Sequence, residues 1–554
     1  MWTFCALALV LLSAVTLPAQ QKVTINVNVS QSAGPFKPVW AWVGHDEPNN
    51  TYSDEGRNLL ARLSDLSSYP VYDRTHNLLT SGDGVPTLKW GSTNAFTRDA
   101  SGKPVYDWSI IDKIFDTYKA TGVRPFVEIG FMPEALSTQP EPYQHHWPKT
   151  FATGWSYPPK DYQEWSELVY QWVRHMVDRY GKAEVAKWKW ELWNEPDIFY
   201  WHGTSEDYLK LYDYTAASVR RALPGALVGG PASTSPSSQR AADFLRQFLE
   251  HCISGKNYAT GKKGVPLDFI SFHAKGKATI ANGQVQLNVG RNLNDIDEGF
   301  AIIAKFPTLR RLPVIVSESD PETCAACYVA SHPENGYRLG SQYASYEAEL
   351  LSGTLALAER HHINLEGSVS WAFTFPGQPV FAGFRAFTTQ DIDLPLLNLF
   401  RMLGQMKRER IAAKSSGALL LDDVLQSSVR AKSDVQSIAT RDGDHRANVL
   451  IWNYHDDSNS PPAVIHLTVG GLPTGVSRVL LKHFQVDHDH SNAHTAWVSM
   501  GSPSNPSAEQ YQRLKAAGQL GLLESPRWVV VSSGTTELTF TEPPQGISLL
   551  EITW

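Results

Sequence analysis

The sequence lacks any cluster of basic residues, and its acidic residues slightly outnumber its basic ones. Lys and Arg total 49 against 56 Asp and Glu, so the 554-residue chain has a formal net charge of −7. Nucleic acids and anionic membranes are bound through basic patches, so we expect neither as a partner. Outside the N-terminus, no apolar run approaches the roughly 20 residues of a transmembrane helix, so we expect no membrane span.

Common cofactor and catalytic motifs are also missing. No Gly-rich phosphate-binding sequence follows the first predicted strand, and neither His-Glu-x-x-His nor Gly-x-Ser-x-Gly occurs. The tract 487–494 contains three histidines, but their spacing is irregular and the tract falls between predicted β-segments. A solvated or interdomain loop is therefore favoured over a metal site. We expect neither cofactor nor metal, and we regard the surrounding loop 484–505 as a candidate contact in an oligomer.

The N-terminus predicts an export signal. Residues 4–17 are almost wholly apolar, and Leu17-Pro18-Ala19 precedes two glutamines. This pattern favours removal of residues 1–19 and export to the periplasm or the medium. The segment before the apolar run has no Lys or Arg, so only the α-amino group supplies positive charge there.

The four cysteines of the chain would be reduced to three by that cleavage. Cys324-Ala-Ala-Cys327 fits a short disulfide loop, half of a zinc site or a redox pair. A zinc site needs a second pair, which is absent, and the preceding Asp-Pro-Glu does not look like the start of a thioredoxin-type helix. A local disulfide is the favoured interpretation for an exported protein, and Cys252 is expected to be a buried thiol.

Residues 36–408 repeat a unit of short apolar strand, polar turn and amphipathic helix. The predicted strands are 39–44, 71–76, 124–130, 187–195, 226–232, 268–274, 312–319 and 368–375. The predicted helices are 55–66, 110–120, 162–180, 207–223, 240–253, 296–305, 343–361 and 396–406. Eight such units predict an α/β fold, a (β/α)8 TIM barrel, with the long connections 78–108 and 132–160 covering its catalytic face.

After residue 408 the helical period disappears. Residues 409–554 contain short strand-like segments bounded by Gly, Pro and Asp, which predicts an accessory β-sandwich. The alternating N-terminal segment, residues 20–35, is expected to join that sandwich as a strand. No long linker separates the two predicted domains.

Two carboxylates end predicted strands of the barrel. A Trp-rich strand runs into Asn194-Glu195-Pro196, and Pro cannot continue an interior strand. A second apolar strand ends at Glu318. Strands four and seven face each other across a barrel mouth, so these carboxyls form the pair that cleavage of a glycosidic bond requires. Glu47 and Glu128 also lie near strand ends, but we rank them as substrate ligands at most.

Other polar side chains converge on the same predicted strand ends. Each histidine alone is more often structural, but together these residues favour a ring that binds sugar hydroxyls. The set comprises His45, Arg74, His76, His273 and Trp371, the last as an aromatic floor for a sugar ring.

The chain resembles the retaining glycosidases of the large (β/α)8 clan with catalytic glutamates on strands four and seven. Within that clan it is similar to glycoside hydrolase family thirty-nine, the β-xylosidases, whose members also carry a β-sandwich. The resemblance covers nearly the whole mature chain. It includes Trp-Asn-Glu-Pro at 193–196, the segments 126–135, 268–273 and 381–385, and a Glu-Ser-Asp-Pro-Glu-x-Cys-Ala-Ala-Cys signature at 318–327.

The resemblance implies specific roles. Glu195 would be the acid/base and Glu318 the nucleophile, while Asn194 would bind the hydroxyl next to the anomeric carbon. His76 and His273 match substrate ligands of the family. The reaction would be a double displacement through a covalent xylosyl-enzyme, for which the two carboxyls should lie ~5–5.5 Å apart.

The sequence therefore predicts an exported, exo-acting β-xylosidase that releases xylose from xylo-oligosaccharides. Residues 43–47 depart from the smaller residues of better-known xylosidases, which leaves a different glycone open. The family includes α-L-iduronidases and arabinose-active enzymes, but no clear Lys/Arg pair stands at the predicted strand ends, which argues against a uronate. A non-catalytic carbohydrate-binding protein is disfavoured because both glutamates are present.

Overall fold

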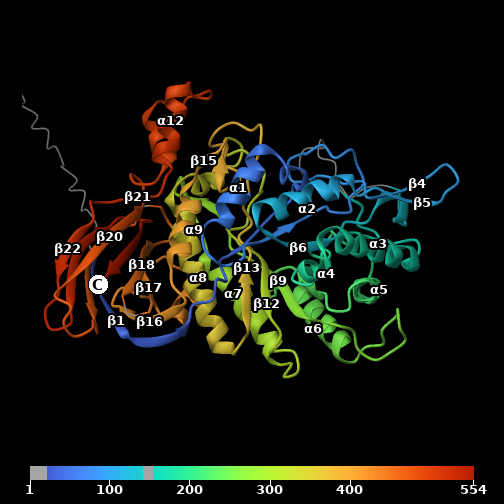
Figure 1. Cartoon of the computed structure of the whole chain (residues 1–554), viewed down its shortest axis with the longest axis horizontal. Coiled ribbons are helices and arrows are strands. Elements are labelled where there is room, and N and C mark those ends of the chain that lie inside the picture. The colour runs from blue at the N-terminus through green and yellow to red at the C-terminus, as the bar shows by residue number, and fades with distance from the viewer. Residues whose placement is uncertain (1–20, 141–153, 444, 459) are drawn as a thin grey trace, which may run out of the picture.

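The computed structural model describes residues 21–140, 154–443, 445–458 and 460–554. A barrel of parallel strands with helices around it lies beside a second domain built mainly of strands (Figure 1). The predicted fold class is therefore confirmed. The predicted export signal lies outside the described residues, as does part of the connection 132–160. Within the described part of the chain, no helix has both the length and the apolarity to cross a bilayer.

The barrel is an eight-stranded parallel sheet in which consecutive barrel strands are neighbours. It closes because Gly44 N–H donates to Ser370 O at 3.1 Å, and Ser370 N–H donates to Trp42 O at 3.1 Å. Closure brings the carboxyl ends of all strands to one mouth, where barrels of this type place their functional residues. The strands are β2 (Trp42–His45), β3 (Tyr72–Thr75), β6 (Arg124–Ile129), β7 (Lys189–Leu192), β8 (Leu227–Ser233), β9 (Phe269–Lys275), β12 (Val314–Asp320) and β13 (Leu365–Ser368).

Amphipathic helices cover the outside of this sheet. In α3, the buried residues Trp165, Leu168, Val169 and Trp172 recur at the spacing of one helical face. The barrel helices are α1 (Asp54–Ser64), α2 (Ser109–Thr121), α3 (Tyr162–Tyr180), α4 (Lys182–Val185), α5 (Ser205–Ala222), α6 (Gln239–Ser254), α7 (Val289–Ala304), α8 (Ser341–His361) and α9 (Pro395–Gln405). Short elements in the connections are η1 (Pro48–Asn50), β4 (Phe96–Arg98), β5 (Pro104–Tyr106), η2 (Glu134–Leu136), β10 (Thr279–Ala281), β11 (Gln284–Gln286), η3 (Pro333–Leu339), β14 (Thr388–Thr389) and β15 (Ile392–Asp393).

Several predicted boundaries differ from the structure, and three of these differences have a clear local reason or bear on the site. Helix α7 begins at Val289 rather than at residue 296, because the Asn288 side chain caps it by accepting from Arg291 N–H at 3.0 Å. Strand β7 ends at Leu192, since Trp193 has φ 68° and cannot continue a strand. Strand β13 ends at Ser368, so Trp371 lies beyond the strand and not within it.

The second domain is a ten-stranded sheet that curls over one apolar core. Its strands are β1 (Gln21–Pro35), β16 (Glu409–Ser415), β17 (Asp434–Asp442), β18 (Arg446–Tyr454), β19 (Ala463–Gly470), β20 (Arg478–Val486), β21 (Gly521–Leu522), β22 (Arg527–Val530), β23 (Thr536–Glu542) and β24 (Ile547–Thr553). His483 of β20 and Phe540 of β23 are far apart in the strand order, yet their rings lie 4.8 Å apart. The two ends of the sheet therefore face each other as a sandwich.

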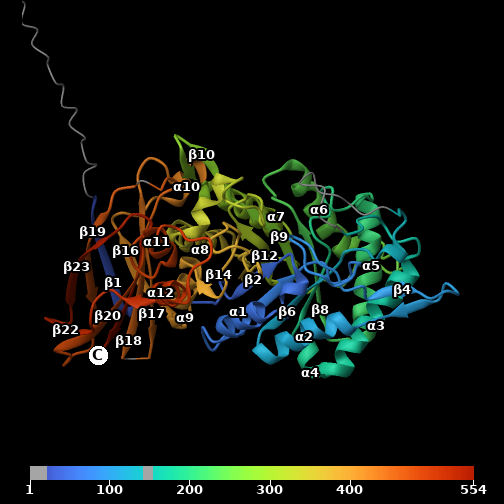
Figure 2. The ribbon, with the colours of Figure 1, turned by 90° about the horizontal axis from the view of Figure 1, so that it is seen from above.

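The N-terminal strand belongs to this second domain. β1 pairs antiparallel with β16 and parallel with β19, so the first described residues lie among the last ones (Figure 2). Its side chains alternate, with Val23, Ile25, Val27 and Val29 buried in the sandwich core. The alternation of apolar and polar residues predicted a half-buried strand, and the structure shows this strand in the domain to which we assigned it.

Three helices complete the second domain. α10 (Leu421–Ser427) packs on α7 of the barrel. α11 (Ala493–Ser499) and α12 (Ala508–Ala517) lie in the connection between β20 and β21, and we call residues 487–520 the arm. Its α12 stands away from the sheet in Figure 1. The His-containing tract lies at the base of the arm, where His494 contacts Phe381 of the barrel domain at 5.4 Å.

Candidate active site

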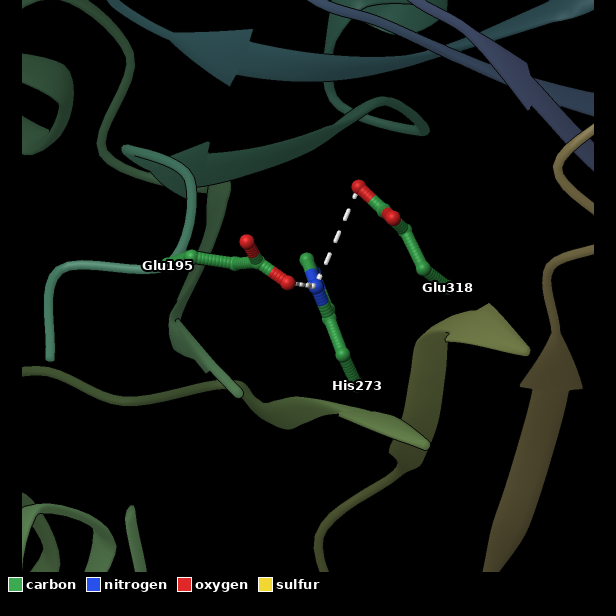
Figure 3. A group of neighbouring side chains, drawn as sticks. All are labelled: Glu195, His273 and Glu318. Atoms are coloured by element: carbon green, nitrogen blue, oxygen red, sulfur yellow. Dashed lines mark hydrogen bonds and ion pairs between the residues drawn. The ribbon is translucent and has the colours of Figure 1, made fainter. Parts of the chain in front are cut away.

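Two carboxyls and a histidine meet at the mouth of the barrel. Glu318 lies on β12 and His273 on β9, while Glu195 follows β7. The His273 ring lies between the two carboxyls (Figure 3): its Nδ1 is 3.0 Å from Glu195 Oε1 and 3.8 Å from Glu318 Oε1. One ligand atom from each of the three residues lies within 4.8 Å of the other two. The sequence-predicted pair is therefore brought together.

The backbone after β7 turns Glu195 into the mouth. Trp193 has φ 68° and Glu195 has φ 46°, a region that residues other than Gly rarely adopt. Two hydrogen bonds hold this turn: Trp193 N–H donates to Ile129 O at 3.2 Å, and Glu195 N–H donates to Ala232 O at 2.9 Å. Such backbone strain concentrates at functional sites because it is retained only where the surrounding structure enforces it.

Glu318 is held as a carboxylate by a ring of donors. Its Oε2 accepts from Lys275 Nζ at 2.7 Å, and its Oε1 accepts from Arg74 Nη1 at 3.1 Å and lies 3.2 Å from His76 Nε2. Burial opposes ionisation, but neighbouring cations that include Lys275 and His76 outweigh it and hold the pKa of Glu318 well below its usual value.

Glu195 experiences the opposite environment. Burial, followed by the negative charge of Glu318, raises the pKa of Glu195 to about 7. Burial also lowers the pKa of His273 to about 4, so its ring is neutral at pH 7. Two neighbouring carboxyls with pKa values displaced in opposite directions are the signature of an acid and a nucleophile.

Arg74 organises the floor of the site. It is fully buried, and its Nε donates to Glu191 Oε2 at 2.5 Å while Nη2 lies 3.4 Å from Glu128 Oε2. Nη2 also donates to Asn194 Oδ1 at 3.3 Å. We predicted Arg74 as a sugar ligand; its contacts instead orient Glu318 and Asn194, so the structure places it beneath the site.

His76 and Trp371 form one wall. His76 Nδ1 lies 2.9 Å from Asp46 Oδ1, Trp371 Nε1 donates to Asp46 Oδ2 at 3.3 Å, and the His76 and Trp371 rings are 4.4 Å apart. A methyl group on Gly44 would lie 2.3 Å from Trp371 Cζ3, so glycine at this position lets the indole approach the barrel backbone. Burial alone would lower the pKa of His76, but Glu128, Asp46 and Glu318 raise it well above its usual value.

The structure does not bring His45 into this group. Its Nδ1 lies 3.2 Å from Asp73 Oδ1, and its Nε2 lies 3.0 Å from Thr51 Oγ1. The ring also stacks on Phe373 at 3.7 Å. Both nitrogens therefore have protein partners, and the predicted sugar contact is replaced by a structural role.

Sequence reasoning missed three charged residues beside Glu318. Lys275 Nζ bridges Glu318 Oε2 and Asp320 Oδ1, at 2.7 Å from each. Asp320 also forms a buried ion pair with Arg385. The pattern His273-Ala-Lys275 was the available signal, because residues two apart on a strand point to the same face. The expectation that no Lys/Arg pair stands at this site was wrong.

Cys324 and Cys327 form a disulfide just beyond β12. Its loop is tied to the site's surroundings, since Arg338 Nη1 donates to Cys324 O at 2.9 Å and Arg385 N–H donates to Ala325 O at 3.1 Å. Cys252 is a buried free thiol.

The arrangement suits acid–base chemistry on a bound sugar. Glu195, His273 and Glu318 also form the one group among the described residues whose donors are close enough to hold a metal ion. Both oxygens of Glu318, however, already accept from cationic side chains. One ionised and one protonated carboxyl facing a common space match the requirement for glycosidic cleavage.

Comparison with known proteins supports this interpretation. The model of "Glycosyl hydrolases family 39" matches residues 23–530. A β-xylosidase of Geobacillus stearothermophilus is 27% identical, covering 87% of this chain and 86% of its own. Human α-L-iduronidase is 25% identical, covering 92% of this chain and 76% of its own. The crystal structure of a monomeric β-xylosidase from Caulobacter crescentus superposes with a TM-score of 0.74 at 22% identity, covering 96% of this chain and 99% of that one.

Proposed function

The chain belongs to glycosyl hydrolase family 39 and is a glycosidase, and from this premise we propose a retaining mechanism with Glu195 as acid/base and Glu318 as nucleophile. The observation that carries the proposal is the carboxyl separation. One oxygen of Glu195 lies within 4.8 Å of one oxygen of Glu318. This close approach fits a retaining pair, whose carboxyl groups lie about 5–5.5 Å apart, better than an inverting pair, whose carboxyl groups lie about 6.5–9.5 Å apart to admit a water.

In the first step, Glu318 attacks the anomeric carbon. The bond to the leaving oxygen breaks, and that oxygen takes the proton of Glu195. Glu318 can attack because Lys275 and Arg74 keep it ionised, and Glu195 can donate because its pKa is raised to about 7. Asn194, fixed by Arg74 at 3.3 Å, is positioned to bind the hydroxyl next to the anomeric carbon.

In the second step, Glu318 has become an ester and has lost its charge. That charge helped to raise the pKa of Glu195, so its loss lets Glu195 remain ionised and act as a base. Water attacks the anomeric carbon, Glu195 takes a proton from it, and Glu318 leaves as a carboxylate. Two displacements on one carbon give net retention.

For the glycone we propose xylose, released from the non-reducing end of xylo-oligosaccharides. The cations of this network already have carboxylate partners, because Lys275 bridges Glu318 and Asp320 while Arg385 binds Asp320. A neutral sugar leaves these pairs intact. The exo-action is proposed from the similarity to β-xylosidases. The connections that follow β2 and β3 are tied together, because Lys89 N–H donates to Glu47 and Asn49 Nδ2 donates to Ser92 O at 2.9 Å.

A uronate glycone is the second candidate. Arg385 Nε is buried and has no hydrogen-bond partner, and it belongs to the same charge network as Lys275. An incoming carboxylate would satisfy this donor. The similarity to human α-L-iduronidase, at 25% identity against 27% for the β-xylosidase, also supports this candidate.

A panel of aryl glycosides separates the candidates. We expect the aryl β-D-xyloside to have the highest kcat/KM; faster turnover of the aryl α-L-iduronide or an α-L-arabinoside would replace xylose by that glycone. For Glu318→Ala, azide should restore activity and give the inverted glycosyl azide. Full activity of Glu318→Ala without azide would refute the catalytic assignment. If the wild type hydrolysed none of the glycosides, a carbohydrate-binding protein would be favoured.

We also propose that the enzyme is exported. The disulfide between Cys324 and Cys327 supports this, since such bonds persist in oxidising compartments. Mass spectrometry of protein from the culture medium or periplasm should find a mature N-terminus near Gln20. A full-length chain confined to the cytosol would contradict the proposal.

A further inference from the structure

The arm of the sandwich domain lies against a loop of the barrel. That loop, residues 372–394, follows β13, and we call it the β13 loop. It contains only the two-residue strands β14 and β15 as regular structure. Ala493 and Leu514 of the arm share an apolar cluster with Phe381 and Phe384 of the β13 loop. Two segments from different domains therefore bury one small core between them.

Phe381 is the central contact. Its ring lies 5.0 Å from the Trp497 ring and 5.4 Å from the His494 ring. Its backbone has φ 53°, a genuine outlier for a bulky side chain, and such a conformation persists only when packing enforces it. The arm supplies that packing, because Trp497 and His494 flank the ring.

Polar contacts also fix the last residues of the loop to the arm. Tyr511 Oη donates to Gln390 O at 2.9 Å, at a residue with φ 47°. Gln519 Nε2 donates to Asp393 Oδ2 at 2.8 Å. Asn398, at the start of the following helix, donates to Ser491 O at 2.9 Å and to Gly518 O at 2.8 Å. Both ends of the arm are thus bound to the barrel domain.

The same loop carries Arg385 into the charge network of the active site. Arg385 Nη1 bonds Asp320, and Asp320 Oδ1 accepts from Lys275 Nζ at 2.7 Å. Lys275 in turn donates to Glu318 Oε2 at 2.7 Å. A continuous series of contacts therefore runs from Trp497 through Phe381 and the loop backbone to the carboxylate of Glu318.

We propose that the arm is a positioning element for catalysis: Trp497 and Tyr511 hold the β13 loop so that Arg385 engages Asp320 and Lys275 remains on Glu318. This proposal rests on the proposed function, since it concerns the nucleophile of that same site. If Arg385 leaves Asp320, the uncompensated Asp320 competes for Lys275. Glu318 then loses a fixed donor and departs from the geometry of attack.

The test measures how fast Glu318 is esterified. A 2-deoxy-2-fluoro glycosyl fluoride, made with whichever glycone the aryl panel selects, labels a glycosidase nucleophile, and intact mass follows the rate. We expect Trp497→Ala to slow labelling and to lower kcat/KM by about tenfold to a hundredfold, the cost of a displacement of roughly 1 Å. Trp497→Phe should restore most of the rate because it keeps a ring against Phe381.

Trp528→Ala is the matched control. Trp528 lies on β22 of the same domain, is 55% exposed and has Arg478 over its ring at 4.3 Å. It should label at the wild-type rate. Tyr511→Phe removes one hydrogen bond and should give a smaller loss in the same direction as Trp497→Ala. It decides the question if Trp497→Ala does not fold.

The outcomes separate the two hypotheses. A wild type that is never labelled at Glu318 refutes the proposed function itself. A labelled wild type with Trp497→Ala or folded Tyr511→Phe reacting at the wild-type rate refutes the positioning role of the arm. Equal loss in Trp497→Ala and Trp497→Phe, or a comparable loss in Trp528→Ala, also refutes it, because a general weakening of the sandwich would then explain the effect.

Discussion

The pKa of Glu195 makes the pH dependence of the reaction a direct test of the site. Burial and the charge of Glu318 raise it from 4.5 to about 7. At 1.36 kcal/mol per pKa unit, this environment disfavours the ionised form by about 3 kcal/mol. For a phenyl glycoside, whose leaving oxygen needs a proton, kcat/KM should therefore be level from the acidic limb set by Glu318 up to about pH 7. It should fall about tenfold with each further pH unit, because only protonated Glu195 is active.

The leaving group provides an internal control. A 2,4-dinitrophenolate leaves without protonation, so the fall above neutral pH should largely disappear for the 2,4-dinitrophenyl glycoside. In Glu195→Gln, kcat/KM for that activated substrate should be retained and independent of pH. Azide should then accelerate release of the glycosyl-enzyme and give a glycosyl azide of retained configuration.

Glu47→Gln distinguishes Glu195 from the other titrating carboxyl nearby. Burial, with the charge of Asp46, raises the pKa of Glu47 to about 8, so Glu47 would also titrate at mildly alkaline pH. The amide of Glu47→Gln can still accept from Lys89 N–H. We expect the phenyl glycoside profile of this variant to keep its alkaline fall. If kcat/KM of Glu195→Gln still fell at alkaline pH, the assignment of Glu195 as the acid would be refuted. Loss of the alkaline fall in kcat/KM of Glu47→Gln would refute it as well.

Three further predictions follow from the structure. Lys275→Met should lower kcat/KM at least about a hundredfold, because Glu318 loses a charge-assisted hydrogen bond. The acidic limb of the pH profile of kcat/KM should also move to higher pH, because the pKa of Glu318 rises. An acidic limb at the wild-type pH in steady-state assays would contradict this. Gly44→Ala should displace Trp371 and thereby lower kcat/KM about tenfold or more. The control Gly225→Ala, which has no atom within 4 Å of the added methyl, should keep the wild-type kcat/KM. Equal activity of the two variants would contradict the prediction. Asp434 is buried beside Glu349 at the domain interface, and burial raises its pKa to about 6. The folded state therefore binds its proton more tightly than the unfolded state, and about 3 kcal/mol of stability present below pH 4 is lost as the pH rises to about 6. Tm measured against pH should fall less steeply over this range in Asp434→Asn; an unchanged slope would contradict the prediction.

The sequence contained enough to predict the architecture and the two carboxyls. Strict alternation in β1 and helical spacing in α3 are local signals, and they predicted these elements almost to their ends. Pro196 marked the end of a strand, which drew attention to Glu195. Boundaries failed where a cap or a left-handed residue decided them, as at Asn288 and Trp193.

Charge partners could not be predicted in the same way, because they depend on distant segments. Arg74 and Glu191 are 117 positions apart, and Arg385 and Asp320 are 65 apart. His45 has the residue type and strand-end position of a sugar ligand, yet Asp73 and Thr51 occupy its ring nitrogens. Strand position alone predicts that a side chain is near the mouth, and it does not predict which neighbour will bind it.

The role of Lys275 differs between the two candidate glycones, a neutral sugar and a uronate. With a neutral sugar, it remains between Glu318 and Asp320, 2.7 Å from each, and serves only to hold the nucleophile. With a uronate, its ammonium would have to turn partly toward the substrate carboxylate and weaken one of these bonds. Lys275→Met should therefore reduce kcat while leaving KM nearly unchanged on a neutral glycoside, but should raise KM sharply on a uronide. Lys275→Met thus tests the charge of the nucleophile and also distinguishes a neutral glycone from a uronate.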